Sequence, residues 1–177
     1  MYTVRPYAGQ DKDDFLGHYR RSWDESGNGE PHFNPFIPGD PEAFRLPKLE
    51  NLDLAVGEEN WLRYWLAIHE EQGIVGHVDL KGPQLKVQMH RCLLGIGIEN
   101  GHRGRGLGRR LMQAAIDFAR AEPGLEWVDL SVFAHNTGAR ALYRNLGFAE
   151  LGQVEDKFRI RDDSITDVIM ALDLRQS

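Results

Sequence analysis

The sequence contains one cysteine, no long apolar run and fewer basic than acidic residues. The single cysteine, Cys92, excludes a disulfide within the chain and fits a reducing compartment. No apolar run approaches the length of a membrane-spanning helix, and residues 1–5 contain no apolar segment of the signal-peptide type. The net charge of -6 argues against a nucleic-acid-binding protein. We therefore expect a cytoplasmic protein that binds neither nucleic acid nor a membrane.

Metal-binding patterns are also missing. The seven histidines show no metal-ligand spacing, so we expect no metal site. Cys92 has no histidine or acid at a recognisable spacing, which predicts a small buried residue rather than a nucleophile. The chain does have 177 residues, 41% of them hydrophobic, which is enough for one domain with a core. We expect a single domain over residues 1–177.

The most informative stretch is a loop rich in Gly and Arg between an apolar run and an amphipathic helix. The apolar run ends at Ile98, and from Leu107 apolar residues recur at helical spacing. Glycines let the backbone turn its N–H groups toward a ligand, and a helix N-terminus adds unpaired donors with a partial positive charge. Full charges come from Arg103, Arg105, Arg109 and Arg110. The stretch predicts a site for a ligand that carries phosphate.

Periodicity and turn residues predict the other elements. The expected strands are 2–7, 62–70, 74–80, 90–99, 127–133, 148–160 and 164–174. The expected helices are 10–23, 40–56, 107–121 and 136–146, although Pro47 interrupts the second. Inside the expected strand 90–99, Gly95 and Gly97 suggest a bulge or a close approach of a ligand. This order predicts an α/β (α+β) fold, a mixed sheet with helices on both faces.

Two motifs resemble those of the GNAT superfamily of N-acetyltransferases. The first, in the loop, has the pattern of that family's pyrophosphate-binding signature: Arg103-x-x-Gly106-x-Gly108. The second follows the strand 127–133 at the expected distance: Asn136-x-x-Ala139-x-x-Leu142-Tyr143-x-x-x-Gly147-Phe148. Residues 158–172 also look like the closing hairpin of the family. The resemblance covers roughly residues 60–174 and is closest to small bacterial enzymes that acetylate amino acids or other small amines.

The resemblance implies a fold and a cosubstrate. The fold would be a GNAT-like, mostly antiparallel sheet of six to seven strands with splayed central strands. Residues 90–150 would form the acetyl-CoA-binding core, and residues 10–60 a helical region on the acceptor side. The residues expected to bind acetyl-CoA are Ile96, Gly97, Ile98, Arg103, Gly104, Arg105, Gly106, Leu107, Gly108, Arg109, Asn136, Ala139 and Tyr143. The family also makes a homodimer an open alternative.

The resemblance further implies direct attack of an amine on the thioester. Tyr143 is the expected general acid, because it would lie near the CoA sulfur; a residue that only packs its ring is the alternative. The backbone N–H of Ile98 would hold the oxyanion. For the base, Glu99 is one candidate and His90 a weaker one, while water or a remote group needs no dedicated residue. Two further residues of the acceptor region, Glu25 and His32, are candidates too.

The predicted function is transfer of acetyl from acetyl-CoA to a primary amine of a small molecule, such as an amino acid or a polyamine. Trp23, His32 and Phe33 are the candidate acceptor contacts, with core or lid packing as the alternative. A protein or peptide N-alpha-acetyltransferase is the alternative within the enzyme class, although the chain has no basic tail. A non-catalytic acyl-CoA-binding sensor module is the alternative from another class.

Overall fold

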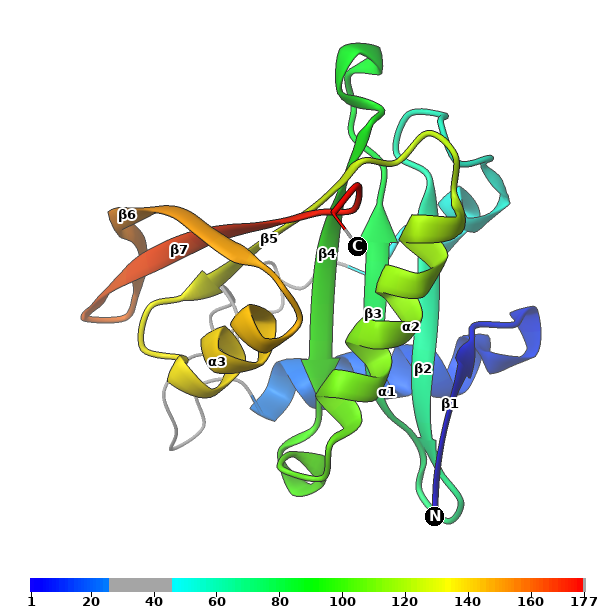
Figure 1. The fold of residues 1–177 in the computed structure, drawn as a ribbon. Coiled ribbons are helices and arrows are strands. Elements are labelled where there is room, and N and C mark those ends of the chain that lie inside the picture. The colour runs from blue at the N-terminus through cyan, green and yellow to red at the C-terminus, as the bar shows by residue number, and fades with distance from the viewer. Residues whose placement is uncertain (26–45, 177) are drawn as a thin grey trace.

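One sheet forms the frame of the molecule (Figure 1), and the computed structural model describes residues 1–25 and 46–176 of the chain. Within these residues the sheet has seven strands in the order β1-β2-β3-β4-β5-β7-β6. Neighbouring strands are antiparallel except for the parallel pair β4 and β5. The strands are β1 (Tyr2–Pro6), β2 (Leu62–His69), β3 (Gly73–Lys81), β4 (Arg91–Ile98), β5 (Trp127–Phe133), β6 (Ala149–Ile160) and β7 (Asp163–Asp173). The mixed, mostly antiparallel sheet predicted from the sequence is confirmed.

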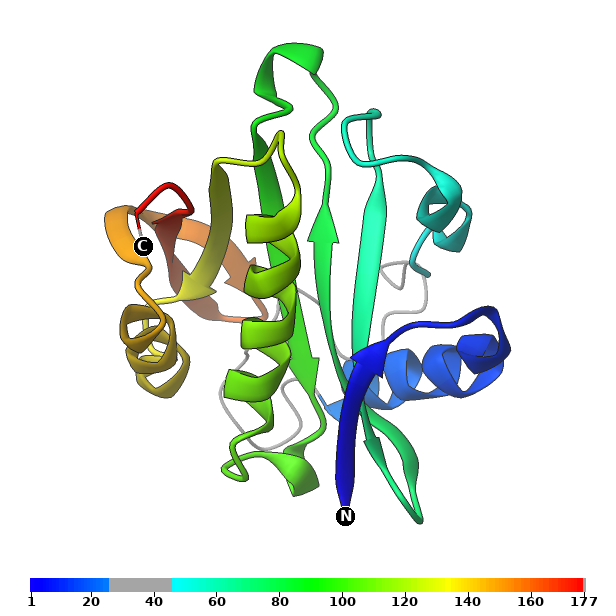
Figure 2. The ribbon, with the colours of Figure 1, turned by 45° about the vertical axis from the view of Figure 1, so that its right-hand side comes forward.

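Helices cover both faces of this sheet, as predicted (Figures 1 and 2). Helix α1 (Lys12–Glu25) lies on one face, where Phe15 packs among buried side chains of β2 and β3. Helices α2 (Leu107–Ala121) and α3 (Thr137–Asn145) lie on the opposite face and close the main core. None of the described helices has the length and the apolar character that a membrane crossing by a helix would require.

Local sequence accounts for the bounds of the two helices near the predicted site. In α2, Leu107, Leu111 and Ala115 are buried at helical spacing, and the helix ends just before Pro123. Helix α3 begins after Asn136, whose side chain accepts a hydrogen bond from the N–H of Ala139 at 3.2 Å. Both motifs singled out in the sequence therefore lie at helix N-termini.

The helix predicted over 40–56 is wrong in the part that the structure describes. Residues 46–56 contain only a short 3-10 helix, η2 (Leu49–Asp53). Pro47 disfavours helical backbone in the residue before it and has no N–H for a helical hydrogen bond, so a longer helix cannot run through it undisturbed. The candidate acceptor contacts His32 and Phe33 lie outside the described residues.

The parallel strands β4 and β5 separate soon after they pair. Their register joins only Arg91–Leu93 to Trp127–Asp129, and beyond these residues the two strands diverge (Figure 1). The splayed central strands that the resemblance implied are therefore present. The divergence leaves the edge of β4 without a strand partner from Leu94 onward.

The bulge suggested by the glycines of β4 is absent, because β3 pairs with β4 without a register shift. A Cβ on Gly97 would lie 2.8 Å from Cε1 of His77, and one on Gly95 would lie 2.8 Å from Oδ1 of Asp79. Real Cβ atoms do not come this close to other atoms. The two glycines therefore make room for polar side chains of β3 that are buried beneath β4.

Candidate active site

A cleft of about 680 Å³ occupies the space where β4 and β5 diverge. Its walls are the facing strand segments 94–98 and 130–133, and the loop before α2 and the first turns of α3 extend them. The lining residues outside the two strands are Ser22, Arg103, Gly104, Gly106, Gly108, Arg109, Asn136, Gly138, Ala139, Leu142, Tyr143, Phe158 and Asp167. The two sequence motifs, which lie about thirty residues apart, are thus brought together in one cleft.

The loop before α2 has the backbone geometry of an anion site. Gly104 (φ 72°) and Gly106 (φ 76°) adopt left-handed conformations that favour glycine. Gly106 is the N-cap of α2, and the first intrahelical bond runs from the N–H of Arg110 to its carbonyl. The backbone N–H groups of residues 107–109, between Gly106 and Arg110, have no acceptor within the helix. The start of α2 therefore offers several hydrogen-bond donors to an anion at once.

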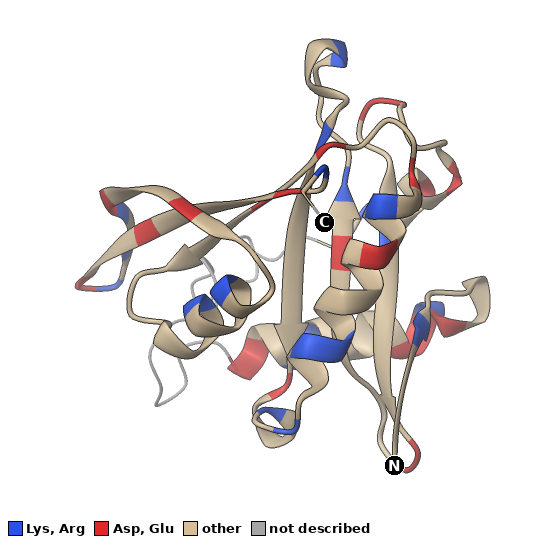
Figure 3. Cartoon of the chain, in the orientation of Figure 1, with Lys and Arg blue, Asp and Glu red and all other residues tan. Residues whose placement is uncertain are grey.

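Arginines strengthen the positive potential around this helix start. Arg109 is exposed and lines the cleft, and Arg103 donates from Nε to the carbonyl of Ile98 at 2.9 Å. Basic residues are also present on the loop before α2 and on α3 (Figure 3). Two residues predicted to contact the cosubstrate do not line the cleft: Arg105, which is exposed, and Leu107, which is buried in the core.

The backbone of β4 offers hydrogen-bonding groups to the cleft. Glu99 donates its N–H to Val75 of β3 at 3.0 Å. Because successive N–H groups along a strand point to opposite edges, the N–H groups of Ile96 and Ile98 lie on the edge away from β3. That edge faces the cleft. An extended ligand with amide groups can therefore pair with β4 here as an added strand.

Tyr143 lines the same cleft from α3. Its side chain is buried, and burial raises the pKa of its hydroxyl to about 12. Its ring lies 6.1 Å from that of Phe148. The hydroxyl has no hydrogen-bond partner among the described residues, so Tyr143 presents a protonated phenol to the cleft at neutral pH.

Glu99, a candidate base, lies outside the cleft lining and under α1. Its Oε1 atom accepts hydrogen bonds from His18 Nδ1 at 2.7 Å and from Arg21 Nε at 3.1 Å. Burial raises the pKa of Glu99, but the bond from His18 and the charge of Arg21 outweigh burial and lower it below its usual range. A carboxylate so stabilised is a weaker base. The arrangement argues against direct proton abstraction by Glu99. The role of Glu99 as the base stays an untested prediction.

A buried polar network continues from Glu99 beneath β4, and no sequence pattern predicted it. Nε2 of His18 lies 2.9 Å from Nδ1 of His77, and both rings are buried. Burial and the neighbouring His18 hold the pKa of His77 well below its usual range. Burial also raises the pKa of Asp79 to about 6 against the opposing charge of Lys81. The only indirect indication in the sequence was the pair Gly95 and Gly97, which lie against the side chains of Asp79 and His77.

The predicted acceptor contacts are only partly placed. Trp23 is buried and does not line the cleft, while His32 and Phe33 lie outside the described residues. The Glu25 carboxylate accepts the N–H of Asn100 at 2.8 Å. His90 precedes β4, at the strand end away from the Gly/Arg loop, and is not part of the cleft. From elements outside the two motifs and the two facing strands, the structure adds Ser22, Phe158 and Asp167 to the cleft, and none of them was predicted as a site residue.

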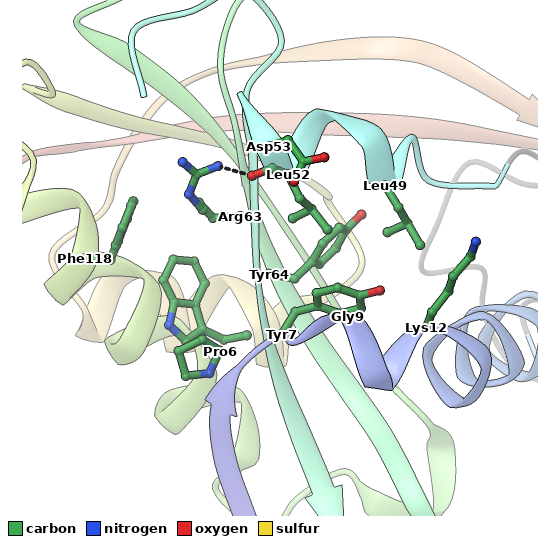
Figure 4. A pocket seen from close by; sticks show the side chains of 11 residues that line it. Pro6, Tyr7, Gly9, Lys12, Leu49, Leu52, Asp53, Arg63, Tyr64 and Phe118 are labelled. Carbon is green, nitrogen blue, oxygen red and sulfur yellow. Dashed lines mark hydrogen bonds between the residues drawn. The ribbon is translucent and has the colours of Figure 1, made fainter. Parts of the chain in front are cut away.

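A second pocket, of about 540 Å³, lies near the opposite edge of the sheet, where β1 ends beside β2. Figure 4 shows Tyr7, Tyr64 and Leu49 around it, with Arg63 donating to the carbonyl of Leu52 at 3.1 Å. This pocket contains no residue of the two sequence motifs. The cleft between β4 and β5 is therefore the candidate active site.

Comparison with known proteins agrees with this geometry. The family model described as "Acetyltransferase (GNAT) family" matches residues 29–148. The N-alpha-acetyltransferase RimI of Mycobacterium tuberculosis is 37% identical over 135 residues, which cover 67% of this chain and 80% of that protein. Streptothricin acetyltransferase of Streptomyces lavendulae is 31% identical over 120 residues, covering 66% of this chain and 62% of that protein.

Solved structures share the fold. A GNAT-family acetyltransferase from Streptococcus pneumoniae has a TM-score of 0.81 at 22% identity, with 97% of this chain and 98% of that chain covered. A Salmonella typhimurium protein solved with its cofactor acetyl-CoA has a TM-score of 0.77 at 16% identity, with 100% and 96% covered. The chain belongs to the GNAT family of acetyl-CoA-dependent N-acetyltransferases.

Proposed function

We propose that this chain transfers an acetyl group from acetyl-CoA to a primary amine of a small molecule. One observation carries the proposal: the open edge of β4 at Ile96–Ile98 shares a cleft with the glycine loop at Gly106 and with Tyr143 of α3. In acetyl-CoA, the pyrophosphate needs the glycine loop, the amide-bearing arm needs the strand edge, and the thioester needs a proton donor. The three features form one continuous site. An ordinary nucleotide has no use for the strand edge.

The donor would bind along this site in extended form. Its pyrophosphate would accept N–H bonds from the start of α2, supported by the charges of Arg103 and Arg109. Its pantetheine arm would pair with the backbone of Ile96 and Ile98, and Asn136 and Ala139 would contact it from α3. The thioester carbonyl would then receive the N–H of Ile98, which stabilises an oxyanion in the transition state.

Transfer would proceed by direct attack of a neutral amine on the thioester carbon. The nitrogen–carbon bond forms, the carbon–sulfur bond breaks, and Tyr143 donates its proton to the departing sulfur. The ammonium form of the acceptor loses one proton to water before attack, and the amide nitrogen loses a second after it. These protons go to the solvent, from which Tyr143 is reprotonated. Glu99 stays in the proposal only as a base to be tested by substitution.

The small-molecule acceptor is favoured over a basic protein partner by the net negative charge of the chain, which has 27 Asp and Glu against 21 Lys and Arg. The similarity to an N-alpha-acetyltransferase from Mycobacterium tuberculosis supports the alternative, a protein or peptide α-amine. A non-catalytic acyl-CoA sensor would have no use for a protonated phenol at the thioester end. The retained Tyr143 therefore favours an enzyme.

An amine panel assayed by release of free thiol from acetyl-CoA tests the proposal. Amino acids and polyamines should give saturable release, and N-terminal peptides at equal concentration should give much less. Faster release with peptides would establish the alternative. Binding of acetyl-CoA without release in any arm would favour the sensor. The cytoplasmic location and a homodimer belong to the same proposal, and the molar mass in solution tests the dimer.

A further inference from the structure

Asp167 is a buried carboxylate on β7 that lines the active-site cleft. Only 1% of the residue is exposed. Its Oδ2 atom lies 2.6 Å from Nζ of Lys157 on β6, whereas its Oδ1 atom is buried without a hydrogen-bond partner. The Lys157 side chain is itself 36% exposed, so it pairs with one oxygen from the solvent side. Oδ1 of Asp167 therefore remains able to accept a hydrogen bond.

Ser22 contributes a second unpartnered polar atom to the same cleft, from helix α1. Its Oγ atom is buried and has no hydrogen-bond partner among the described residues. Four buried side-chain polar atoms in the described part of the chain are without partners, and two of them belong to Ser22 and Asp167. The other two, on Trp61 and Asp79, belong to residues outside the cleft.

Unpartnered polar atoms in a buried position cost free energy unless a ligand or water satisfies them. Neither atom belongs to the groups that would hold acetyl-CoA, which come from β4, α2 and α3. Phe158, whose ring packs 5.4 Å from that of Phe133, adds an apolar wall beside Asp167. A carboxylate oxygen, a hydroxyl and an aromatic wall are suited to a group that has a positive charge and an apolar stem.

The charge of Asp167 decides which part of an acceptor it can hold. A carboxylate next to an amine favours the ammonium form, which cannot attack the thioester. The reacting nitrogen is therefore a poor partner for Asp167, and a second cationic group of the acceptor is a good one. We propose that the acceptor is a diamine or a longer polyamine whose non-reacting ammonium donates to Oδ1 of Asp167 and to Oγ of Ser22. This inference rests on the proposed function and narrows its substrate class.

The test compares matched amines on the full-length protein. Putrescine and cadaverine should be acetylated with a kcat/KM at least about tenfold above that of n-butylamine and n-pentylamine, because a charge-assisted hydrogen bond is worth roughly that factor or more. Asp167→Asn should lower kcat/KM for the diamines by about ten- to a hundredfold through KM, and leave the monoamines within about threefold. The KM for acetyl-CoA should not change.

Ser22→Ala separates binding from folding. Removing a buried hydroxyl that has no partner among residues 1–25 and 46–176 should leave Tm unchanged or raise it, since alanine is also the better helix former. The same variant should raise the KM for putrescine by about three- to tenfold. Glu155→Gln is the matched control, since this exposed carboxylate of β6 lies outside the cleft and its loss should alter neither KM.

The outcomes distinguish the inference from the proposed function. If wild-type protein turns over monoamines as well as diamines, or acetyl-CoA binds but no diamine reacts, the inference is wrong while the donor site stands. If Asp167→Asn and Ser22→Ala leave the diamine KM unchanged, the two side chains do not form the anchor. If acetyl-CoA itself does not bind, the proposed function fails first.

Discussion

Oε1 of Glu99 lies 2.7 Å from Nδ1 of the fully buried His18. This contact fixes α1 against the end of β4 and continues to His77 beneath Gly97. The carboxylate is thus engaged in holding the strand whose backbone would polarise the thioester. The contact suggests a positioning role for Glu99 and gives the first prediction.

Glu99→Gln should lower kcat by less than about tenfold and lower Tm, because glutamine keeps the size of the side chain but not its charge beside His18 and Arg21. A direct general base would contribute about a hundred- to ten-thousandfold. Steady-state rates between pH 6 and pH 9 measure the difference, with the exposed Glu71→Gln as control. A loss of a hundredfold or more, with the acid limb of the pH profile removed, would make Glu99 the base.

Gly106→Asp should abolish acetyl-CoA binding, because an anionic side chain would occupy the site of the pyrophosphate at a backbone position with φ 76°. Gly106→Ala should cost about 1 to 2 kcal/mol of stability from the left-handed conformation alone. Calorimetric titration and thermal melting measure the two effects. The exposed Gly124→Asp, which meets no atom within 4 Å, is the matched control. Retained binding in Gly106→Asp would remove the loop from the donor site.

Tyr143→Phe should lower kcat by at least about tenfold and leave the Kd of acetyl-CoA within a factor of about three, since it removes one proton donor and little contact area. Because burial raises the pKa of this hydroxyl to about 12, the wild-type rate should show no basic limb from Tyr143 below about pH 11. Tyr64→Phe, at a buried tyrosine outside the cleft, is the control. Equal losses of kcat and affinity would make Tyr143 a packing residue.

The contribution of Asp79 to stability should fall as the pH rises from about 4 to 6, and the difference between wild type and Asp79→Asn isolates it from the other carboxylates. The pKa of Asp79 is raised from 3.8 in the unfolded chain to about 6 in the fold, so the folded state binds the proton more tightly and loses stability as the proton leaves. The loss should be on the order of 3 kcal/mol, at about 1.4 kcal/mol per pKa unit.

Denaturant unfolding between about pH 4 and pH 6 measures the free energy of unfolding of wild type and of Asp79→Asn. The variant should lack the loss of stability that Asp79 causes. The exposed Asp162→Asn is the control and should keep it. Identical pH profiles for wild type and Asp79→Asn would show that the buried carboxyl does not titrate in this range.

Periodic patterns predicted much of the frame. Helix Leu107–Ala121 and strand Trp127–Phe133 have the predicted bounds, because apolar spacing and flanking turn residues act locally. The helix predicted over 40–56 is wrong in its described part, where Pro47, already named as an interruption, precedes only a short 3-10 helix. The donor loop could be predicted because its residues are consecutive in sequence.

The acceptor side could not be predicted in the same way. Ser22, Phe158 and Asp167 come from α1, β6 and β7, and only the sheet order brings them to one cleft. The buried contacts of His18, His77 and Glu99 likewise join α1, β3 and the end of β4. No spacing along the chain encodes such contacts, because each depends on the register between distant elements.

Calorimetric titration of acetyl-CoA into the wild-type protein tests the central claim most directly. We expect saturable binding of one acetyl-CoA per chain, lost in Gly106→Asp and kept in Tyr143→Phe. Absence of any binding signal, or equal binding by wild type and Gly106→Asp, would contradict a donor site between β4 and β5.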